Sequence, residues 1–252
     1  MSVKPVALAT AGSAGLGAAT AKLFARSGFR VAVNFNNNEA RANDLVQQLR
    51  SSTEDARSDD FIALRADLAD RDAIYKLVDA TVDHFGRLDV VFSNGGWTTY
   101  RDITNLDDNI VENDWDRCYN MNVKSHLFLM HASKSHLDKT SGSFIATASL
   151  AGVTVSGSSL AYSVSKAAQL HLIKGLAKSA GPNIRVNSVS PGLMLTDWAK
   201  TVFPENVPEA TRERTPLKRL VTVEDVADQV LCFVRSKSVT GANAVIDSGL
   251  SL

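Results

Sequence analysis

The chain has 252 residues with 27 basic and 27 acidic side chains, so its formal net charge is zero, and 44% of its residues are hydrophobic. This composition is that of an ordinary globular protein, and it argues against disorder. The balanced charge, without a basic stripe, argues against nucleic acid as a partner, and no apolar run is long enough to span a membrane.

Residues 1–5 run straight into strand-like sequence, without the charged and apolar regions of a signal peptide. Cys118 and Cys232 both lie in helix-like sequence, and we expect two buried free thiols in a reducing compartment. We therefore expect a cytoplasmic protein.

Short apolar runs alternate with helix-length segments along nearly the whole chain. Most of these runs are continuous rather than alternating, as expected for parallel strands covered on both faces. The expected strands are 6–10, 30–35, 61–66, 88–93, 144–149, 184–189 and 244–247, and the expected helices are 15–27, 39–50, 70–85, 108–138, 159–180 and 223–235. The alternation predicts an α/β fold over residues 1–252: a single-domain, doubly wound parallel sheet of Rossmann type with helices on both faces.

Residues 192–221 break this rhythm. They carry three prolines together with Trp198 and Phe203, and they contain no clear strand. A long irregular insert late in an α/β chain is either a mobile lid or a set of helices that the pattern hides. A substrate lid with short helices is the interpretation we prefer.

A glycine cluster follows the first expected strand and opens the first expected helix. Glycines 12, 15 and 17 allow unusual backbone dihedrals, so that N–H groups and a helix N-terminus can approach a pyrophosphate. The alternative is a tight turn of small residues, but the position between strand and helix favours a dinucleotide site.

The end of the second strand bears on the choice of cofactor. A carboxylate that would grip the adenosine ribose is expected there, but the first acid is Glu39. No Arg or Lys is present to attract a 2′-phosphate either, although Ser13 and residues 34–38, which are mostly asparagines, could hydrogen-bond one. We therefore expect NADP(H) to be favoured over NAD(H).

Three residues have a spacing that suits proton transfer. Ser149 ends the fifth expected strand, and Tyr162 and Lys166 follow four residues apart on a helix, so that both share one face. A neighbouring ammonium favours the ionised form of a phenol, so we expect Lys166 to lower the pKa of Tyr162. Tyr-x-x-x-Lys alone could be a surface pair, but Ser149 and the glycine loop favour catalysis.

Together these motifs resemble the short-chain dehydrogenase/reductase family over about residues 5–249. Residues 10–17 are similar to its cofactor loop, Thr-Gly-x-x-x-Gly-x-Gly, and Ser93-Asn94-Gly95-Gly96 is similar to its Asn-Asn-Ala-Gly strand end. The resemblance implies that Asp67-Leu68 contacts the adenine and that Pro191-Gly192 with Thr196 contacts the nicotinamide carboxamide. The full set of implied cofactor residues is Gly12, Ser13, Gly15, Leu16, Gly17, Asn36, Asp67, Leu68, Asn94, Gly95, Tyr162, Lys166, Pro191, Gly192 and Thr196.

The resemblance also assigns catalytic roles. It implies that Tyr162 exchanges the proton, that Ser149 orients the substrate oxygen, and that Lys166 with Asn122 resupplies the proton through a bound water. Asp247-Ser248-Gly249 is similar to an Asp-Gly-Gly segment that lies by a subunit interface in the family, which implies a homotetramer or homodimer.

Several positions depart from the family pattern. Ala11 replaces the first glycine of the cofactor loop, and Ser248 replaces a glycine near the C-terminus. Basic residues that many NADP-preferring members carry are absent at Ala14 and Asn36, and Ser93 and Gly95 alter the strand-four motif. These departures leave the four catalytic positions intact.

The segments expected to face the substrate are rich in apolar and aromatic side chains. They include Trp97, Leu150, Met194, Trp198 and Phe203, which favour an apolar or aromatic small molecule. The two tryptophans could instead pack the lid against the body. The five histidines, 84, 126, 131, 136 and 171, lack ligand spacing, and we expect no metal site.

The expected activity is NADPH-dependent reduction of a ketone. NAD-dependent alcohol oxidation in the same site remains open, as do a non-redox isomerisation or cyclisation on the same scaffold and a cofactor-binding regulatory protein without chemistry.

Overall fold

The computed structural model describes residues 4–54 and 56–252. Residues 1–3, which belong to the segment examined for a signal peptide, lie outside the described residues. Seven strands form one parallel sheet in the order β3-β2-β1-β4-β5-β6-β7. The strands are β1 (Val6–Ala9), β2 (Arg30–Phe35), β3 (Phe61–Arg65), β4 (Val90–Ser93), β5 (Ser143–Thr147), β6 (Arg185–Pro191) and β7 (Asn243–Ile246). The predicted doubly wound sheet is confirmed.

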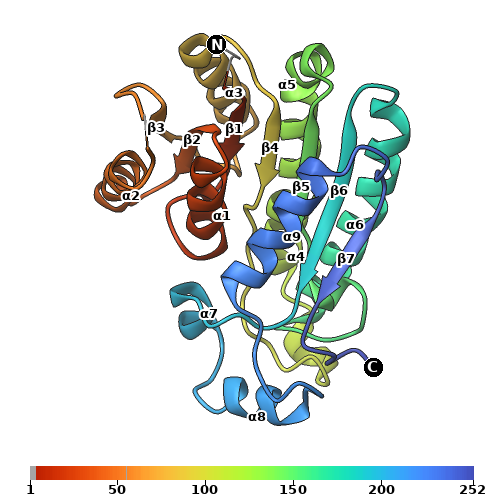
Figure 1. Ribbon diagram of the computed structural model, residues 1–252. Helices are drawn as coiled ribbons and strands as arrows, with labels where there is room; N and C mark the ends of the chain where they lie inside the picture. The colour runs from red at the N-terminus through yellow and green to blue at the C-terminus, as the bar shows by residue number, and fades with distance from the viewer. Residues whose placement is uncertain (1–3, 55) are drawn as a thin grey trace.

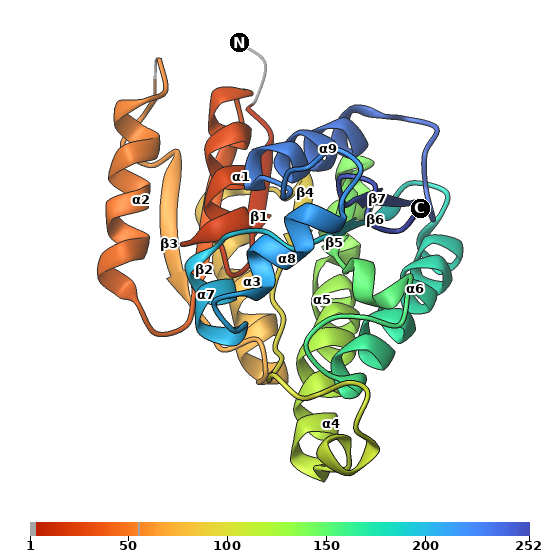
Figure 2. The same ribbon diagram turned by 90° about the horizontal axis from the view of Figure 1, so that it is seen from below.

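Helices cover both faces of the sheet (Figure 2), so the apolar side chains of the strands are buried on both sides. One hydrophobic core lies under α1 (Gly15–Arg26), α2 (Glu39–Ser51) and α9 (Val223–Arg235). The other core lies under α3 (Arg71–Phe85), α5 (Ser125–Thr140) and α6 (Leu160–Ala180). β1 and β4, at the centre, are buried at every position.

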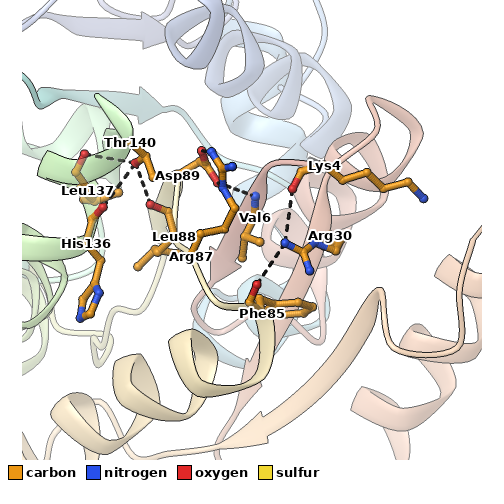
Figure 3. Close-up of polar contacts among 10 residues, drawn as sticks. All are labelled: Lys4, Val6, Arg30, Phe85, Arg87, Leu88, Asp89, His136, Leu137 and Thr140. Atoms are coloured by element: carbon orange, nitrogen blue, oxygen red, sulfur yellow. Dashed lines mark hydrogen bonds and ion pairs between the residues drawn. The ribbon is translucent and has the colours of Figure 1, made fainter. Parts of the chain in front are cut away.

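Polar side chains tie the amino-terminal edge of the sheet together (Figure 3). Arg30 donates to the carbonyl of Phe85 at 3.1 Å, and the carboxylate of Asp89 accepts from the backbone N–H of Val6 at 2.8 Å. Arg87 donates to the same carboxylate from two nitrogens. These contacts fasten the edge opposite the loops that carry the candidate site.

The prediction of one continuous helix over 108–138 is wrong at the start and in the middle of that range. The structure has a 3₁₀ turn at Leu106–Asn109, then α4 (Glu112–Tyr119), a π-helical turn at Asn120–Lys124, and then α5. A π turn keeps the chain helical but adds a residue to the turn, so the apolar pattern hides it. π turns are frequent at functional sites, and this one holds Asn122.

Small differences separate the predicted and observed strand ends. β5 ends at Thr147, so Ser149 lies beyond the strand and caps the 3₁₀ turn Leu150–Gly152 by accepting from the N–H of Ala151 at 3.1 Å. β6 continues to Pro191, two residues further than expected, because it pairs with β7 along that length.

The irregular insert contains two short helices, α7 (Asp197–Val202) and α8 (Val207–Arg214). Figure 1 shows both beyond the carboxyl ends of the strands. An isolated parallel bridge between Met194 and Val221 joins the two ends of the insert. The insert is therefore anchored at its base beside the edge where ligands bind in open α/β sheets.

The two cysteines differ, and the expectation that both are buried is wrong. Both are free thiols, but only Cys118 is buried, whereas Cys232 lies on the outer face of α9 and is exposed. Of the helices in the described part of the chain, none combines the length and apolar character needed to cross a membrane.

Candidate active site

The glycine loop and the start of α1 form a cradle with open hydrogen-bond donors. α1 begins at Gly15, and the residue before it, Ala14, offers no side chain to cap the first N–H groups. The first turn also carries no acidic residue. Unpaired N–H groups and the positive end of the helix dipole suit an anion such as a pyrophosphate.

The loop fits a dinucleotide because its glycines cannot be replaced by larger residues. A Cβ on Gly12 would lie 2.6 Å from the carbonyl oxygen of Ala9, and one on Gly17 would collide with the carbonyl of Ala11. Gly15 has a φ of +49°, and a Cβ there would lie 3.1 Å from Cγ2 of Thr196. The glycine loop and Thr196, which come from the two halves of the sheet, therefore lie against each other.

The strand-four motif joins the glycine loop to the neighbouring strands. Asn94 receives a hydrogen bond from the hydroxyl of Thr147 at 2.9 Å, and its N–H donates to the hydroxyl of Thr10 at 2.9 Å. A Cβ on Gly95 would collide with the side chain of Leu68. The structure thus brings together the residues expected to contact the adenine and those expected beside the nicotinamide.

The end of β2 differs from the sequence-based expectation in two ways. Asn34 is buried, and both polar atoms of its side chain are hydrogen-bonded. Its Oδ1 accepts from the N–H of Ala11 at 3.0 Å. Its Nδ2 donates to the carbonyls of Phe35, Leu64 and Ala66. Its side chain therefore has no group left for a phosphate. A basic residue does stand at this edge, because Nε of Arg65 donates to the carbonyl of Asn36 at 3.0 Å.

Arg65 was missed because it lies on another strand. The parallel register pairs Phe35 with Arg65, so the two strands end together. Aligning the ends of the expected strands 30–35 and 61–66 is the signal that would have found it. The Asn36 side chain is exposed at the same edge, and Asp67 is exposed two residues beyond Arg65.

The three expected catalytic groups converge at the carboxyl edge. Tyr162 lies in the first turn of α6, where the hydroxyl of Ser159 caps the helix by accepting from its N–H at 3.2 Å. The Ser149 side chain lies beside the Tyr162 phenol and favours its ionised form. Nζ of Lys166 lies 5.7 Å from the centre of the Tyr162 ring.

The protonation of this group differs from the expectation. Burial raises the pKa of Tyr162 to about 12, and the Ser149 side chain opposes that rise only in part. Burial also lowers the pKa of Lys166 to about 7. The expected lowering of the phenol pKa is therefore wrong for the chain alone, because both groups lose solvation on burial.

Asn122 acts through its whole side chain on the loop after β4. Its Oδ1 accepts from the N–H of Trp97 at 2.8 Å, and its Nδ2 donates to the carbonyl of Trp97 at 2.9 Å and to Ser165 at 3.0 Å. A Cβ on Gly96 would lie 3.2 Å from this Oδ1 and 3.6 Å from Nζ of Lys166. Asn122, Gly96 and Lys166 are therefore neighbours at the floor of the site.

The residues expected to contact the substrate differ in how deeply they are buried. Trp97 is half-buried with the guanidinium of Arg117 4.2 Å from its ring centre, and Leu150 is buried. Phe203 from the insert meets Tyr100 edge-to-face at 6.1 Å, while Trp198 is 47% exposed on α7. The Trp97 contact is with α4 and not with the insert, whereas the aromatic contact between Phe203 and Tyr100 joins the insert to the loop after β4.

Two further residues beside Lys166 were not anticipated. Gln169 accepts a hydrogen bond from Nζ of Lys166 at 2.9 Å, and His126 lies 2.9 Å from Gln169. Both side chains are fully buried. A polar residue one turn after the lysine, on a helix face that must be buried, is the signal that would have found Gln169, and no local pattern relates His126 on α5 to it.

Known proteins resemble this chain over nearly its whole length. The family model described as Enoyl-(Acyl carrier protein) reductase matches residues 10–251. This chain belongs to the short-chain dehydrogenase/reductase family. It is accordingly an oxidoreductase that acts on C=O or CH–OH groups with NAD(P).

Relatives with named activities include several reductases. A protein of Streptomyces violaceoruber, provisionally named ketoacyl reductase 2 of the granaticin polyketide synthase, is 35% identical over 251 residues, covering 98% of this chain and 96% of that protein. Versicolorin reductase of Emericella nidulans is 30% identical and covers 97% and 94%. The 3-oxoacyl-acyl-carrier-protein reductase of Staphylococcus aureus is 30% identical and covers 99% of both chains.

Solved structures of short-chain dehydrogenases/reductases have the same fold as this chain. A short-chain dehydrogenase from Burkholderia cenocepacia in complex with NADP has a TM-score of 0.86 and 31% identity, with 98% of both chains covered. A 7α-hydroxysteroid dehydrogenase complexed with NADH and a 7-oxo bile acid has a TM-score of 0.87 and 27% identity, with 97% and 93% covered.

Proposed function

We propose that this short-chain dehydrogenase/reductase reduces a ketone on an apolar or aromatic small molecule with NADPH. The observation that carries the proposal is the convergence of Ser149, Tyr162 and Lys166 beside the glycine cradle. Relatives named as ketoacyl, versicolorin and 3-oxoacyl reductases support reduction of a carbonyl as the physiological direction.

The chain's own residues divide the work of the reaction. Ser149 donates a hydrogen bond that orients the substrate carbonyl, and Tyr162 gives its phenolic proton to the carbonyl oxygen as that oxygen gains negative charge. The Lys166 ammonium places a positive charge beside the phenol, which favours release of this proton and its replacement through Lys166 and a water that Asn122 would hold. A bound nicotinamide cofactor supplies the hydride for the carbonyl carbon, so that carbon and oxygen together gain the two hydrogens of an alcohol.

The cofactor would be held by the loops at the carboxyl edge. The glycine cradle would hold the pyrophosphate, the ends of β2 and β3 would hold the adenosine, and the loops after β4 and β6 would hold the nicotinamide. The residues proposed for these contacts are Gly12, Ser13, Gly15, Leu16 and Gly17, then Asn36, Asp67 and Leu68, and then Asn94, Gly95, Tyr162, Lys166, Pro191, Gly192 and Thr196. An apolar substrate suits the Trp97, Leu150, Met194, Trp198 and Phe203 side chains.

Replacing Tyr162 by Phe tests the proposed proton donor. Tyr162→Phe removes the proton but keeps the ring, so we expect ketone reduction to fall by at least about 100-fold. NADPH binding, followed by tryptophan fluorescence, should change little. The matched control is Tyr75→Phe, because the Tyr75 hydroxyl bonds His131 at the surface far from this site. Full turnover by Tyr162→Phe would remove Tyr162 from the role.

A preference for NADP(H) over NAD(H) is the second part of the proposal. No carboxylate stands at the end of β2 to repel a 2′-phosphate, and the guanidinium of Arg65 is held at this edge by the Asn36 carbonyl. Arginine binds phosphate through charge-assisted hydrogen bonds. The NADP complex of the Burkholderia relative agrees with this preference, while the NADH complex of the hydroxysteroid dehydrogenase keeps NAD-dependent alcohol oxidation as the alternative.

Arg65→Ser tests this preference directly. We expect the dissociation constant for NADPH to rise about tenfold, because a charge-assisted contact is lost, while that for NADH stays unchanged. Arg235→Ser, an exposed substitution on α9, is the control and should leave both constants unchanged. An equal loss for NADPH and NADH, or tighter binding of NADH by the unaltered protein, would contradict the proposal.

We also propose that the protein is cytoplasmic and forms a homo-oligomer. The resemblance to a subunit-interface segment at residues 247–249 supports an oligomer, as does the exposure of apolar side chains such as Val245 on the edge strand β7.

A further inference from the structure

A chain of buried polar side chains leads from Lys166 into the core between α5 and α6. Nζ of Lys166 donates to Oε1 of Gln169 at 2.9 Å, and Nε2 of Gln169 lies 2.9 Å from Nε2 of His126. Nδ1 of His126 lies 2.6 Å from the hydroxyl of Ser93 at the end of β4. His126 and Gln169 are completely buried, and Ser93 and Lys166 are 2% and 3% exposed.

The lysine fixes the direction of every hydrogen bond in this chain. An ammonium can only donate, so the Gln169 oxygen faces Lys166 and the Gln169 amide nitrogen faces away from it. That nitrogen has two N–H groups, which reach His126 Nε2 and the carbonyl of Thr147 at 3.2 Å. Nε2 of His126 must therefore accept, which leaves its ring neutral with the proton on Nδ1, donated to Ser93.

The surroundings of His126 agree with a neutral ring. Burial and the positive charge of Lys166 lower the pKa of His126 to about 3, with a smaller opposing effect from the Gly95 backbone. The histidine thus stays an acceptor toward Gln169 over the whole range in which an enzyme of this kind would work.

The amino group of Lys166 is held by two acceptors, the Gln169 amide oxygen and the Thr147 carbonyl, each at 2.9 Å. The ammonium has a third N–H, and a Cβ on Gly96 would lie 3.6 Å from Nζ. Gln169 is itself held by Thr147 and His126, so the position of the ammonium depends on all three. We propose, on the basis of the proposed ketone reduction, that Gln169 and His126 are positioning residues that set the place and the charge of Lys166.

The row of hydrogen-bonded side chains from Lys166 to Ser93 does not conduct protons. The Gln169 amide neither gains nor loses a proton near neutral pH, so it blocks any relay between His126 and Lys166. Its effect on the reaction runs through the geometry and the charge of the lysine.

The pH profile reports that charge. The titratable groups facing Lys166 are Tyr162 on its own helix, Cys118 from α4 and His126 from α5. Burial lowers the pKa of Lys166 to about 7, with a smaller opposing effect from Cys118. Reduction needs the ammonium, and a lysine loses its charge as the pH rises through its pKa. kcat/KM for reduction should therefore decline above about pH 7 in the unaltered protein.

Two substitutions at Gln169 should move this decline in opposite directions. Gln169→Leu removes an acceptor from the ammonium, so the decline should begin about one pH unit lower, with a loss of about tenfold at pH 8. Gln169→Glu places a carboxylate there and should move the decline to higher pH. Packing damage would lower the rate without shifts of opposite sign. Ser133→Ala is the control, because Ser133 is equally buried on α5 and its hydroxyl is unpaired in the described structure.

A measurement that does not depend on enzymatic activity tests the same row of hydrogen bonds. Nitrogen-15 NMR of labelled histidines, with His126→Gln to assign the signal, should show a neutral Nδ1–H ring between about pH 5 and 9. An Nε2–H ring, or an imidazolium, would overturn the inference, as would unchanged pH profiles in both Gln169 variants of an active enzyme. If the unaltered protein reduced no ketone, the proposed function would fail, and the NMR result would still decide whether the chain is built as described.

Discussion

Ala11 and Ser248 hold backbone conformations that glycine adopts without strain. Their φ angles are 45° and 57°, in the left-handed region, and both stand where the family pattern has a glycine. A residue with a Cβ costs about 1–2 kcal/mol in this conformation. The departures from the motif therefore changed the residue but not the backbone shape that the cofactor loop and the C-terminal segment require.

Restoring glycine at these positions should stabilise the protein. For Ala11→Gly and Ser248→Gly we expect the free energy of unfolding in urea to rise by about 0.5–1 kcal/mol each, since the greater freedom of glycine in the unfolded chain offsets part of the relief. Ala14→Gly is the control, because Ala14 has an extended φ of −151° and no strain to release. A lower midpoint for both glycine variants would show that neither position is strained.

At the scale of the residue, the sequence predicted contacts between near neighbours. Tyr162 and Lys166 share one helix, and Ser149 lies just before it, so spacing alone could place them together. Arg65 meets Asn36 across 29 positions, and His126 meets Gln169 across 43, between elements that no local pattern relates. The pKa of Tyr162 was also beyond prediction, because desolvation depends on the packing around the phenol.

At the scale of the element, apolar runs predicted the type and order of the strands but not their ends. β5 stops at Thr147 because its neighbour β6 pairs with it only that far, which places Ser149 in the following turn. The π turn around Asn122 left no proline or glycine in the sequence to mark it. The irregular insert was recognised by its prolines, while the lid role remains a prediction.

The insert should be the first part of the chain to yield to a protease. α8 buries none of its residues, and Lys200, Arg212 and Arg214 are exposed. We expect trypsin to cut the unliganded protein there first. If the insert closes as a lid through the Phe203–Tyr100 contact, NADPH with a ketone substrate should slow this cleavage on the order of tenfold, because cleavage needs local opening.

Cleavage after Arg57 supplies the internal control for this experiment. Arg57 is exposed in the connection between α2 and β3, distant from the insert in the fold (Figure 1). Its rate should stay the same with and without ligands. Equal cleavage rates in the insert under both conditions would count against the lid.

At the scale of the whole molecule, the site exists only because loops from both halves of one sheet meet at its carboxyl edge. The glycine loop after β1 lies against Thr196 beyond β6, and the loop after β4 lies against α6. The second half of the sheet ends in β7, which pairs on one side only and has no fully buried residue. An edge strand left in this state favours association with another chain.

We therefore expect a homo-oligomer whose contact includes β7. Light scattering should give a mass at least twice the 27.1 kDa of one chain, and four times that mass for the tetramer implied by the family. Val245 is 40% exposed on β7, so Val245→Glu would bury a charge in such a contact and should at least halve the measured mass. Leu106→Glu, at a side chain that is 69% exposed on the loop before α4, is the control for a surface charge and should leave the mass unchanged. A single-chain mass for the unaltered protein would refute the oligomer, and an unchanged mass for Val245→Glu would move the contact away from β7.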